Sequence, residues 1–393
     1  MVGTTLEEVS ELREYESPEG VVADLNPDYP IYCVRPHAIR RAAKVFVERF
    51  PGDTLYAVKC NPMPHVLKEL YDAGIRHFDT ASLAEISLVS DLLPDAVCYF
   101  MHPVKARSAI VEAHTNYGVR HHVVDHRTEL EKISEMIPPA PEVVILVRLA
   151  VRHQAVVYDL SSKFGTSVEN AVDLVTEAAS LGFSAGVSFH VGSQCLDADA
   201  FRTGIKCVSE VMQRTNVALQ CVDVGGGFPG KYLNYSGQEL SEYIDAIAEA
   251  ARELELSEGC QLLCEPGRGL SADGESLIVQ VQLRKGSAIY INDGVYGSMN
   301  EEMHGLRRLN RMVTTRDFSS TRQPFTLYGP TCDSMDVLPF PVELPEDIKE
   351  GDWIEFGAVG AYGAACRTAF NGFFADTFVA VQNEFASDNS VTS

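Results

Sequence analysis

Short apolar runs alternate with longer segments of helical period between about residue 37 and residue 265. This alternation is typical of a parallel sheet built from βα units. The expected strands are Leu55–Val58, Arg76–Phe78, Val97–Phe100, His121–Val124, Val143–Leu149, Ala185–Phe189, Gln220–Val224 and Gln261–Cys264. Amphipathic segments between them include Pro64–Ala73, Ser82–Leu93, Val168–Leu181 and Glu239–Leu256. Eight such strands predict a closed (β/α)8 barrel.

The pattern changes after Gly274, where strand-like runs follow one another without long helices. They are Ser276–Arg284, Ala288–Ile291, Phe325–Leu327, Trp353–Phe356 and Phe378–Gln382, punctuated by Gly and Pro. An earlier strand, Ile31–Arg35, is expected to join the same sheet. The sequence therefore predicts an α/β protein with an N-terminal segment (1–36) joining the β domain, a barrel (37–272) and a C-terminal β domain (273–393). The last eight residues are expected to fray.

Composition is ordinary for a folded protein, with 393 residues, 46% of them hydrophobic and 22% charged. The net charge of −23 disfavours binding to nucleic acid phosphates, which requires a surplus of Lys and Arg. A cationic small molecule is easier to accommodate, although solubility alone explains the same charge.

The ten cysteines show neither paired CxxC motifs nor a Cys/His spacing suited to zinc, so we expect reduced thiols and no metal site. The N-terminus lacks an apolar core, and the most apolar stretch, Val143–Val151, is interrupted by Arg148. These features predict a cytoplasmic protein without a membrane segment.

Reactive residues follow several of the expected strands. They are Lys59, Asp79, Arg148, His190, Gly225–Gly227 and Glu265. Taken singly, each has an ordinary explanation, since such a lysine is usually solvated and such a histidine is usually structural. In a barrel, however, the carboxyl ends of the strands meet at one mouth.

Together these residues match what pyridoxal 5'-phosphate (PLP) requires of a protein. The cofactor needs an amine for attachment, backbone N–H groups and a cation for its phosphate, and a carboxylate that keeps the pyridine nitrogen protonated. Lys59, Gly225–Gly227, Arg268 and Glu265 fit these needs.

Eight motifs carry a family resemblance. They are AVKCNP (57–62), FDTAS (78–82), FHVGSQ (189–194), GGGFPG (225–230), CEPGRG (264–269), NDGVYGSMN (292–300), YGPTCDSMD (328–336) and FNGF (370–373). In this order, from about residue 30 to residue 380, they resemble the ornithine/lysine decarboxylases of PLP fold type III. Gln194 and the modest length are more similar to bacterial members. The resemblance implies an alanine-racemase-like fold, with a PLP-binding barrel and a β domain.

The resemblance also implies roles in the barrel. Lys59 would carry the cofactor on its amine, His190 would stack on the pyridine face and Glu265 would pair with the ring nitrogen. The phosphate would be bound by Ser193, Gly226, Gly227, Arg268 and Tyr362. Asp79 and Arg148 would support the site.

Further implied roles fall in the β domain. Cys332 would deliver a proton to the substrate's α-carbon, and Asp333 would bind its distal ammonium. Both would reach into the barrel of a partner chain, so that a homodimer shares its active sites. Phe370 and Asn371 would line this interface, and the other expected substrate contacts are Tyr296, His304 and Phe370.

One departure bears on the substrate. Eukaryotic ornithine enzymes of the family carry a Tyr-Asp pair, whose carboxylate contacts the distal amine, where this chain has His304-Gly305. Decarboxylation of ornithine or lysine to a diamine, a step of polyamine biosynthesis, is the leading hypothesis. Because this carboxylate is missing, a larger cationic amino acid or an amine-bearing conjugate is also a candidate substrate.

Other functions stay open. Arginine or diaminopimelate is an alternative substrate, although a diaminopimelate enzyme would carry a Glu-Ser combination after the cysteine, where Asp333-Ser334 stands here. A racemase is disfavoured, because the barrel-fold alanine racemases place an arginine at the position of Glu265. A regulator without catalytic activity would lose cofactor ligands, which are all present.

Overall fold

The computed structural model describes residues 12–152, 156–158, 160–234 and 238–388. Its contacts divide the chain into two compact units. The barrel unit comprises residues 42–229 and 236–269, and the sheet unit comprises residues 1–41, 230–235 and 270–393. This division lies a few residues from the expected boundaries and assigns residues 230–235 to the sheet unit.

The barrel unit contains a closed ring of eight parallel strands in the order β11-β12-β3-β4-β5-β6-β7-β9. These strands are β3 (Asp53–Ala57), β4 (His77–Thr80), β5 (Val97–Phe100), β6 (His121–Val124), β7 (Val144–Leu149), β9 (Ser184–Phe189), β11 (Leu219–Asp223) and β12 (Gln261–Cys264). The expected barrel is thereby confirmed. Three strands have the predicted bounds, and the others differ from them by one or two residues at an end.

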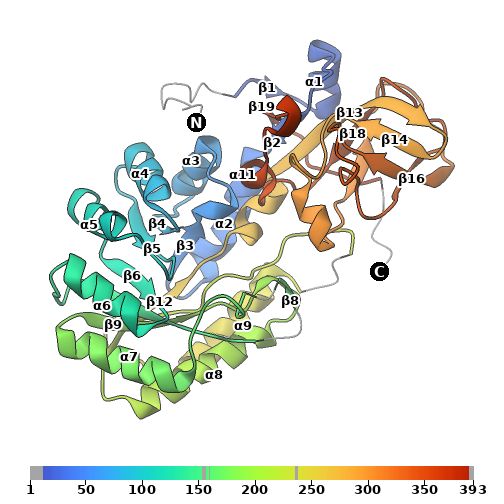
Figure 1. Ribbon diagram of the computed structural model, residues 1–393. Coiled ribbons are helices and arrows are strands. Elements are labelled where there is room, and N and C mark those ends of the chain that lie inside the picture. Colours follow the sequence, from blue (N-terminus) through green and yellow to red (C-terminus); the bar gives the residue numbers. More distant parts are fainter. Residues whose placement is uncertain (1–11, 153–155, 159, 235–237, 389–393) are drawn as a thin grey trace. The chain divides into compact units, whose positions relative to one another are not determined.

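Helices surround the barrel strands (Figure 1). They are α2 (Pro36–Arg49, which begins in the sheet unit), α3 (Pro64–Asp72), α4 (Leu83–Leu92), α5 (Arg107–Asn116), α6 (Arg127–Met136), α7 (Val168–Leu181), α8 (Asp199–Arg214) and α9 (Leu240–Arg252). Helix α4 illustrates why they begin where they do. The Ser82 hydroxyl accepts the N–H of Glu85 at 3.3 Å, and the Glu85 carboxylate accepts the N–H of Ala81 at 2.7 Å.

A small two-stranded antiparallel sheet also belongs to the barrel unit. It pairs β8 (Val156–Tyr158) with β10 (Ser193–Cys195). Strand β10 follows β9 closely, so this small sheet lies beyond the carboxyl end of a barrel strand. The sequence did not predict it.

The sheet unit contains a nine-stranded sheet with the main order β1-β19-β2-β13-β14-β16-β17, and β18 pairs with both β13 and β15. The strands are β1 (Glu14–Tyr15), β2 (Ile31–Val34), β13 (Glu275–Lys285), β14 (Ala288–Ile291), β15 (Asn310–Met312), β16 (Arg322–Tyr328), β17 (Val342–Pro345), β18 (Trp353–Phe356) and β19 (Thr377–Val381). The pairing of β2 with β13 and β19 confirms that the early strand joins this sheet.

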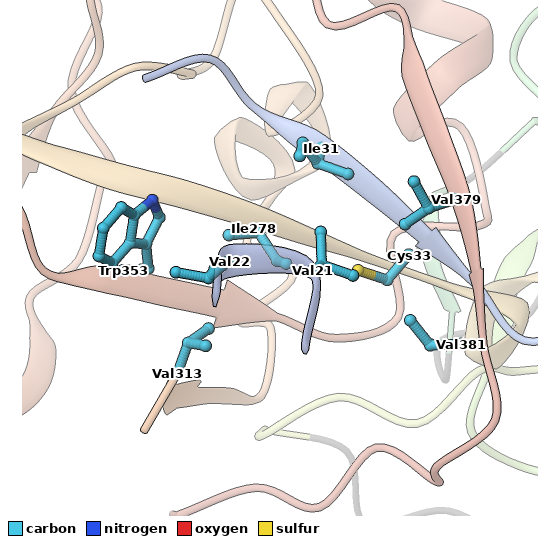
Figure 2. Packing of buried hydrophobic residues seen from close by; sticks show 9 residues of the cluster. All are labelled: Val21, Val22, Ile31, Cys33, Ile278, Val313, Trp353, Val379 and Val381. Carbon is cyan, nitrogen blue, oxygen red and sulfur yellow. The ribbon is translucent and has the colours of Figure 1, made fainter. Parts of the chain in front are cut away.

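Short helices complete the sheet unit. They are α1 (Pro18–Leu25), α10 (Arg268–Ser271, which begins in the barrel unit), α11 (Gly363–Cys366) and the single turns η3 (Ala272–Gly274), η4 (Asn300–His304) and η5 (Phe370–Gly372). Figure 2 shows an apolar cluster that joins α1 to the sheet, with Val21 and Val22 beside Ile31, Ile278 and Trp353.

A charged network is buried in the sheet unit. The carboxylate of Glu355, which is fully buried, accepts hydrogen bonds from Arg35 at 2.8 Å and from Arg311 at 2.6 Å. Arg311 also binds Glu19 of α1 at 2.7 Å. Burial favours the protonated form of Glu19, but hydrogen bonds, led by that from Arg311, outweigh it and lower its pKa to about 2.

Part of the segment that was expected to fray is held in place. Asp388 accepts the N–H of Met312 at 2.9 Å and the Ser387 hydroxyl donates to the Asn310 carbonyl oxygen at 3.0 Å, so both residues contact β15; residues 389–393 lie outside the described part. No helix in the described part of the chain is long and apolar enough to cross a membrane. Nor do the described residues include a group of three or more His, Cys, Asp or Glu side chains that could hold a metal ion.

Candidate active site

The structure brings the predicted barrel residues together at one mouth. Lys59 lies in the single turn η2 (Val58–Cys60), directly after β3. Asp79 and Arg148 lie near the ends of β4 and β7, and Glu265 directly follows β12. Because all eight strands are parallel, these carboxyl ends face the same side of the barrel.

Lys59 is paired with Asp79. Its Nζ lies 2.5 Å from Oδ2 of Asp79, which is 1% exposed, whereas the lysine side chain is 41% exposed. The other oxygen of Asp79 has no hydrogen-bond partner among the described residues. A lysine held by one buried carboxylate and still open to solvent suits an amine that must meet a cofactor.

The glycine run after β11 leaves room that a larger residue would fill. A Cβ at Gly226 would lie 2.6 Å from the Glu265 carbonyl oxygen and 2.9 Å from Nε2 of His190. Gly227 has a φ of +119°, and a Cβ there would lie 2.6 Å from the Gly192 carbonyl oxygen. Only glycine fits at these two positions, so main-chain atoms line the mouth directly.

A cation and a hydroxyl lie in the same unit. The Arg268 guanidinium donates to the Ser193 hydroxyl at 3.3 Å and lies 6.0 Å from the centre of the Tyr158 ring. The two-stranded sheet of β8 and β10 supplies both of these neighbours. A guanidinium, a hydroxyl and a glycine-lined backbone form a set that suits a phosphate group.

His190 is held as a neutral ring. Its Nδ1 accepts the N–H of Gly192 at 3.0 Å, which assigns the ring proton to Nε2. Burial, and then the positive charges of Arg148 and Lys59, lower its pKa well below the ordinary value. A neutral imidazole that is fixed in orientation can pack flat against an aromatic cofactor.

Two buried carboxyl groups share the floor of the site. Glu265 is 8% exposed and Asp223, the last residue of β11, is fully buried. Burial raises the pKa of Asp223 to about 6, although Oδ1 accepts the Gly225 N–H at 2.8 Å. Burial, and then the negative charges of Asp223 and Asp79, raise the pKa of Glu265 well above its ordinary range. A carboxyl group with a raised pKa has a high affinity for a proton, so Glu265 is suited to share one with a ring nitrogen.

Asp223 is a site residue that sequence reasoning missed. A carboxylate inside an otherwise apolar strand, Val-Asp-Val, is costly to bury and was the available signal. Its side chain links the glycine run to Glu265, since it binds Gly225 and raises the pKa of Glu265.

A second group of predicted residues lies in the sheet unit. The Tyr296 hydroxyl donates to Oδ2 of Asp333 at 2.5 Å, and the centre of its ring lies 4.9 Å from that of Phe370. The exposed Cys332 donates its backbone N–H to Oδ1 of Asn371 at 3.0 Å. The structure thus brings together the residues expected to bind the distal ammonium and to deliver a proton.

Two more predicted residues also belong to the sheet unit. His304 is exposed at the end of η4, and Tyr362 precedes α11 with a left-handed backbone, at φ 61°. The assignment of Tyr362 to the phosphate and of His304 to the substrate stays a prediction.

The chain matches known proteins along most of its length. A family model described as the pyridoxal binding domain of pyridoxal-dependent decarboxylases matches residues 37–272. A probable ornithine decarboxylase of Dictyostelium discoideum is 34% identical over 344 residues, 81% of this chain and 72% of the relative. Antizyme inhibitor 2 of Xenopus laevis is 34% identical over 349 residues, 81% and 73% of the two chains.

Solved structures show the same fold. An arginine decarboxylase of Paramecium bursaria Chlorella virus superposes with a TM-score of 0.82 at 26% identity, covering 92% of this chain and 98% of that one. A lysine/ornithine decarboxylase of Vibrio vulnificus, complexed with putrescine, gives a TM-score of 0.80 at 29% identity, covering 94% and 100%.

The barrel, its lysine and these matches define a PLP-dependent enzyme of fold type III, and the glycine-lined mouth fits that cofactor. The chain belongs to the ornithine/lysine decarboxylase family. Its reaction is the decarboxylation of a basic amino acid.

Proposed function

We propose that this protein converts ornithine or lysine to the corresponding diamine and CO2. The observation that carries the proposal is the carboxylate of Asp333, which is oriented by the Tyr296 hydroxyl beside the ring of Phe370. A fixed carboxylate next to aromatic rings suits the terminal ammonium of such a substrate.

The barrel residues supply the cofactor's surroundings. PLP, when bound, withdraws electrons from the substrate's α-carbon, so that the bond to the carboxylate can break. In our proposal, Lys59 would hold the cofactor through its amine, and His190 would pack on the ring face. Glu265 would keep the ring nitrogen protonated, and Arg268 and Ser193 would bind the phosphate together with the glycine backbone.

We further propose that the active unit is a two-fold dimer with shared sites. Cys332 and Asp333 of one chain would complete the barrel site of its partner, as the family resemblance implies. The exposed surface near Cys332 supports such an interface, because Phe370, Phe373 and Phe374 are 41%, 44% and 44% exposed. Three exposed aromatic rings in one short segment suit burial against another chain.

Decarboxylation of a longer substrate is the second candidate function, because the chain has no side chain at position 305. Gly305 stands where the eukaryotic ornithine enzymes of the family carry an aspartate; a Cβ there would meet no atom within 4 Å, while the left-handed backbone, at φ +90°, favours glycine. The likeness to an arginine decarboxylase fits the same idea. Gly305→Asp, which restores a carboxylate, should shift the ratio of kcat/KM for ornithine over lysine; an unchanged ratio would show that this position does not select the substrate.

The direct test is an assay of CO2 release. Purified protein would be offered ornithine, lysine, arginine and diaminopimelate in parallel, and the preferred substrate is expected to be ornithine or lysine. A visible absorption band from bound PLP without CO2 release from any of the four would favour another amine-bearing substrate. Absence of both the band and the activity would favour a regulatory role. We consider this role because antizyme inhibitor 2 is among the similar proteins.

We also propose a cytoplasmic location. All ten cysteines are free thiols, and Cys332 and Cys366 are exposed, as is usual for a protein of a reducing compartment. Fractionation of cells that express the tagged protein would test this.

A further inference from the structure

The turn that carries Cys332 and Asp333 is held by two different residues. Asp333 accepts the Tyr296 hydroxyl through Oδ2 and the N–H of Met335 through Oδ1, at 2.5 Å and 2.9 Å. The N–H of Cys332 instead donates to the side chain of Asn371 at 3.0 Å, 39 positions further along the chain. Cys332 is therefore held from outside its own turn.

Asn371 has a backbone shaped for this contact. It adopts a left-handed conformation, φ 54° and ψ 12°, inside η5. Asparagine is one of the few residues besides glycine that adopt this conformation readily. The conformation and the side-chain acceptor together explain why an asparagine suits the position.

The segment around Asn371 is anchored to Tyr296. Both the N–H and the hydroxyl of Thr368 donate to the Tyr296 carbonyl oxygen at 2.9 Å, and the Thr368 hydroxyl accepts the N–H of Phe370 at 3.3 Å. A ring of contacts results, which runs from Tyr296 through Asp333, Cys332 and Asn371 back to Tyr296. One side of it orients a carboxylate, and the other holds the backbone of the residue that carries the thiol.

We propose that Asn371 is a positioning residue, which fixes the Cys332 thiol for delivery of the proton to the substrate's α-carbon. This rests on the proposed function and on the role of proton donor that the family resemblance implies for Cys332. In that step the S–H bond breaks, and the proton joins the electron pair that CO2 leaves on Cα. The sulfur becomes a thiolate, which regains a proton from water.

A misplaced thiol has a recognisable chemical consequence. If Cys332 does not protonate Cα promptly, a proton from water can reach the cofactor's carbon instead. Hydrolysis then gives an aldehyde and pyridoxamine phosphate in place of the diamine. Because an exposed turn samples several positions unless its backbone is held, the abortive fraction of turnovers reports on the position of the thiol.

Four variants separate the contributions of Asn371, Tyr296 and Cys332 to the outcome of each turnover. Asn371→Gly keeps the left-handed backbone but loses the acceptor, whereas Asn371→Asp keeps both. Tyr296→Phe is the matched control, since it frees Asp333 and leaves the contact between Cys332 and Asn371 in place. Cys332→Ala tests the proposed acid itself.

In the PLP-loaded enzyme, Asn371→Gly should raise the abortive fraction by about ten-fold and change KM by less than about two-fold. Asn371→Asp should show the same abortive fraction as the wild-type enzyme. Tyr296→Phe should instead raise KM by about ten-fold and leave the abortive fraction unchanged. Hydrogen exchange gives a readout independent of turnover, because the Cys332 amide should exchange about ten-fold faster in Asn371→Gly but not in Tyr296→Phe.

The possible failures are distinguishable. A normal abortive fraction in Asn371→Gly, with a raised one in Cys332→Ala, would overturn the positioning role and leave the acid intact. A normal fraction in Cys332→Ala would overturn the acid, and with it the protonation step of the proposed function. If Asn371→Gly does not fold, Asn371→Ala also removes the acceptor but disfavours the left-handed backbone as well, so a normal product ratio and normal exchange in that variant would equally overturn the positioning role.

Discussion

The two groups of predicted site residues differ in how they are held. At the barrel mouth, Asp79, Asp223 and Glu265 are buried, and main-chain atoms crowd the glycine run from two sides. In the sheet unit, Cys332 is exposed and its backbone N–H is held by one asparagine. Geometry that many contacts determine tolerates little change, whereas geometry that a few contacts determine can be altered by a few substitutions. We therefore expect substitutions in the sheet unit to alter the site more readily than substitutions at the barrel mouth.

Removing the cofactor's attachment point should have the largest effect. Lys59→Ala should lower kcat by on the order of a thousand-fold or more, because no other amine is expected to take its place. Treatment of the wild-type protein with borohydride should fix PLP to the peptide that contains Lys59. Lys44→Ala, which removes an exposed lysine, is the control. Fixation of PLP elsewhere in the Lys59→Ala chain would show that the assignment is wrong.

Complementation should show whether the two groups act in separate chains. Lys59→Ala and Asp333→Ala should each be nearly inactive, the second because the substrate's distal cation would lose its partner. Random subunit exchange would make about half of the dimers mixed, each with one intact site, so activity should recover to about a quarter of wild type. Measured exchange of subunits without recovery would place both residues in the site of the same chain.

A smaller effect is expected from the acid beneath the cofactor. Glu265→Gln should lower kcat by about ten-fold or more, because the ring nitrogen would lose its negative partner, while PLP stays bound. The absorption spectrum would verify cofactor binding in the same sample. Unchanged turnover would remove Glu265 from the mechanism.

The smallest predicted effects are changes in stability with pH, which should have opposite signs in the two units. The pKa of Asp223 is raised to about 6, so its contribution to stability is full below about pH 4 and is lost as the pH rises through 6. Asp223→Asn cannot ionise and should stabilise the cofactor-free protein at pH 8 by about 1–2 kcal/mol, while slowing catalysis.

Glu19 in the sheet unit should behave in the opposite way. Its pKa is lowered to about 2, so its contribution is present above about pH 4.5 and is lost as the pH falls towards 2. Glu19→Gln should therefore cost about 1 kcal/mol at pH 7, a figure reduced for its partial exposure, and nothing at pH 2. Urea unfolding across this pH range would measure both variants; the same pH profile for wild type and Asp223→Asn would contradict the first assignment.

Much of the barrel could be predicted from the sequence, because long apolar runs separated by amphipathic segments carry a strong signal. Strands β5, β6 and β12 have the predicted bounds. The two-stranded sheet of β8 and β10 and the short strand β15 were not predicted, since strands of three residues are too short to show a period. Asp223 was missed as a site residue, and Asn371 was expected only to line the interface, for a related reason. Asp223 accepts the N–H of Gly225 where the chain turns after β11, and Asn371 accepts the N–H of Cys332 from 39 positions away. A local sequence pattern does not reveal either contact.

Strand β2 has a consequence for synthesis of the protein. Its residues pair with β13 and with β19, so Ile31 finds its first strand partner only when the ribosome has added about 240 more residues, on the order of ten seconds to a minute later. During that time an apolar strand is without its neighbours. The eight barrel strands all lie between residues 53 and 264, so each has its partners before β19 is made. A stalled or truncated chain would therefore expose β2, which makes the nascent polypeptide a candidate for chaperone binding until its last strand is complete.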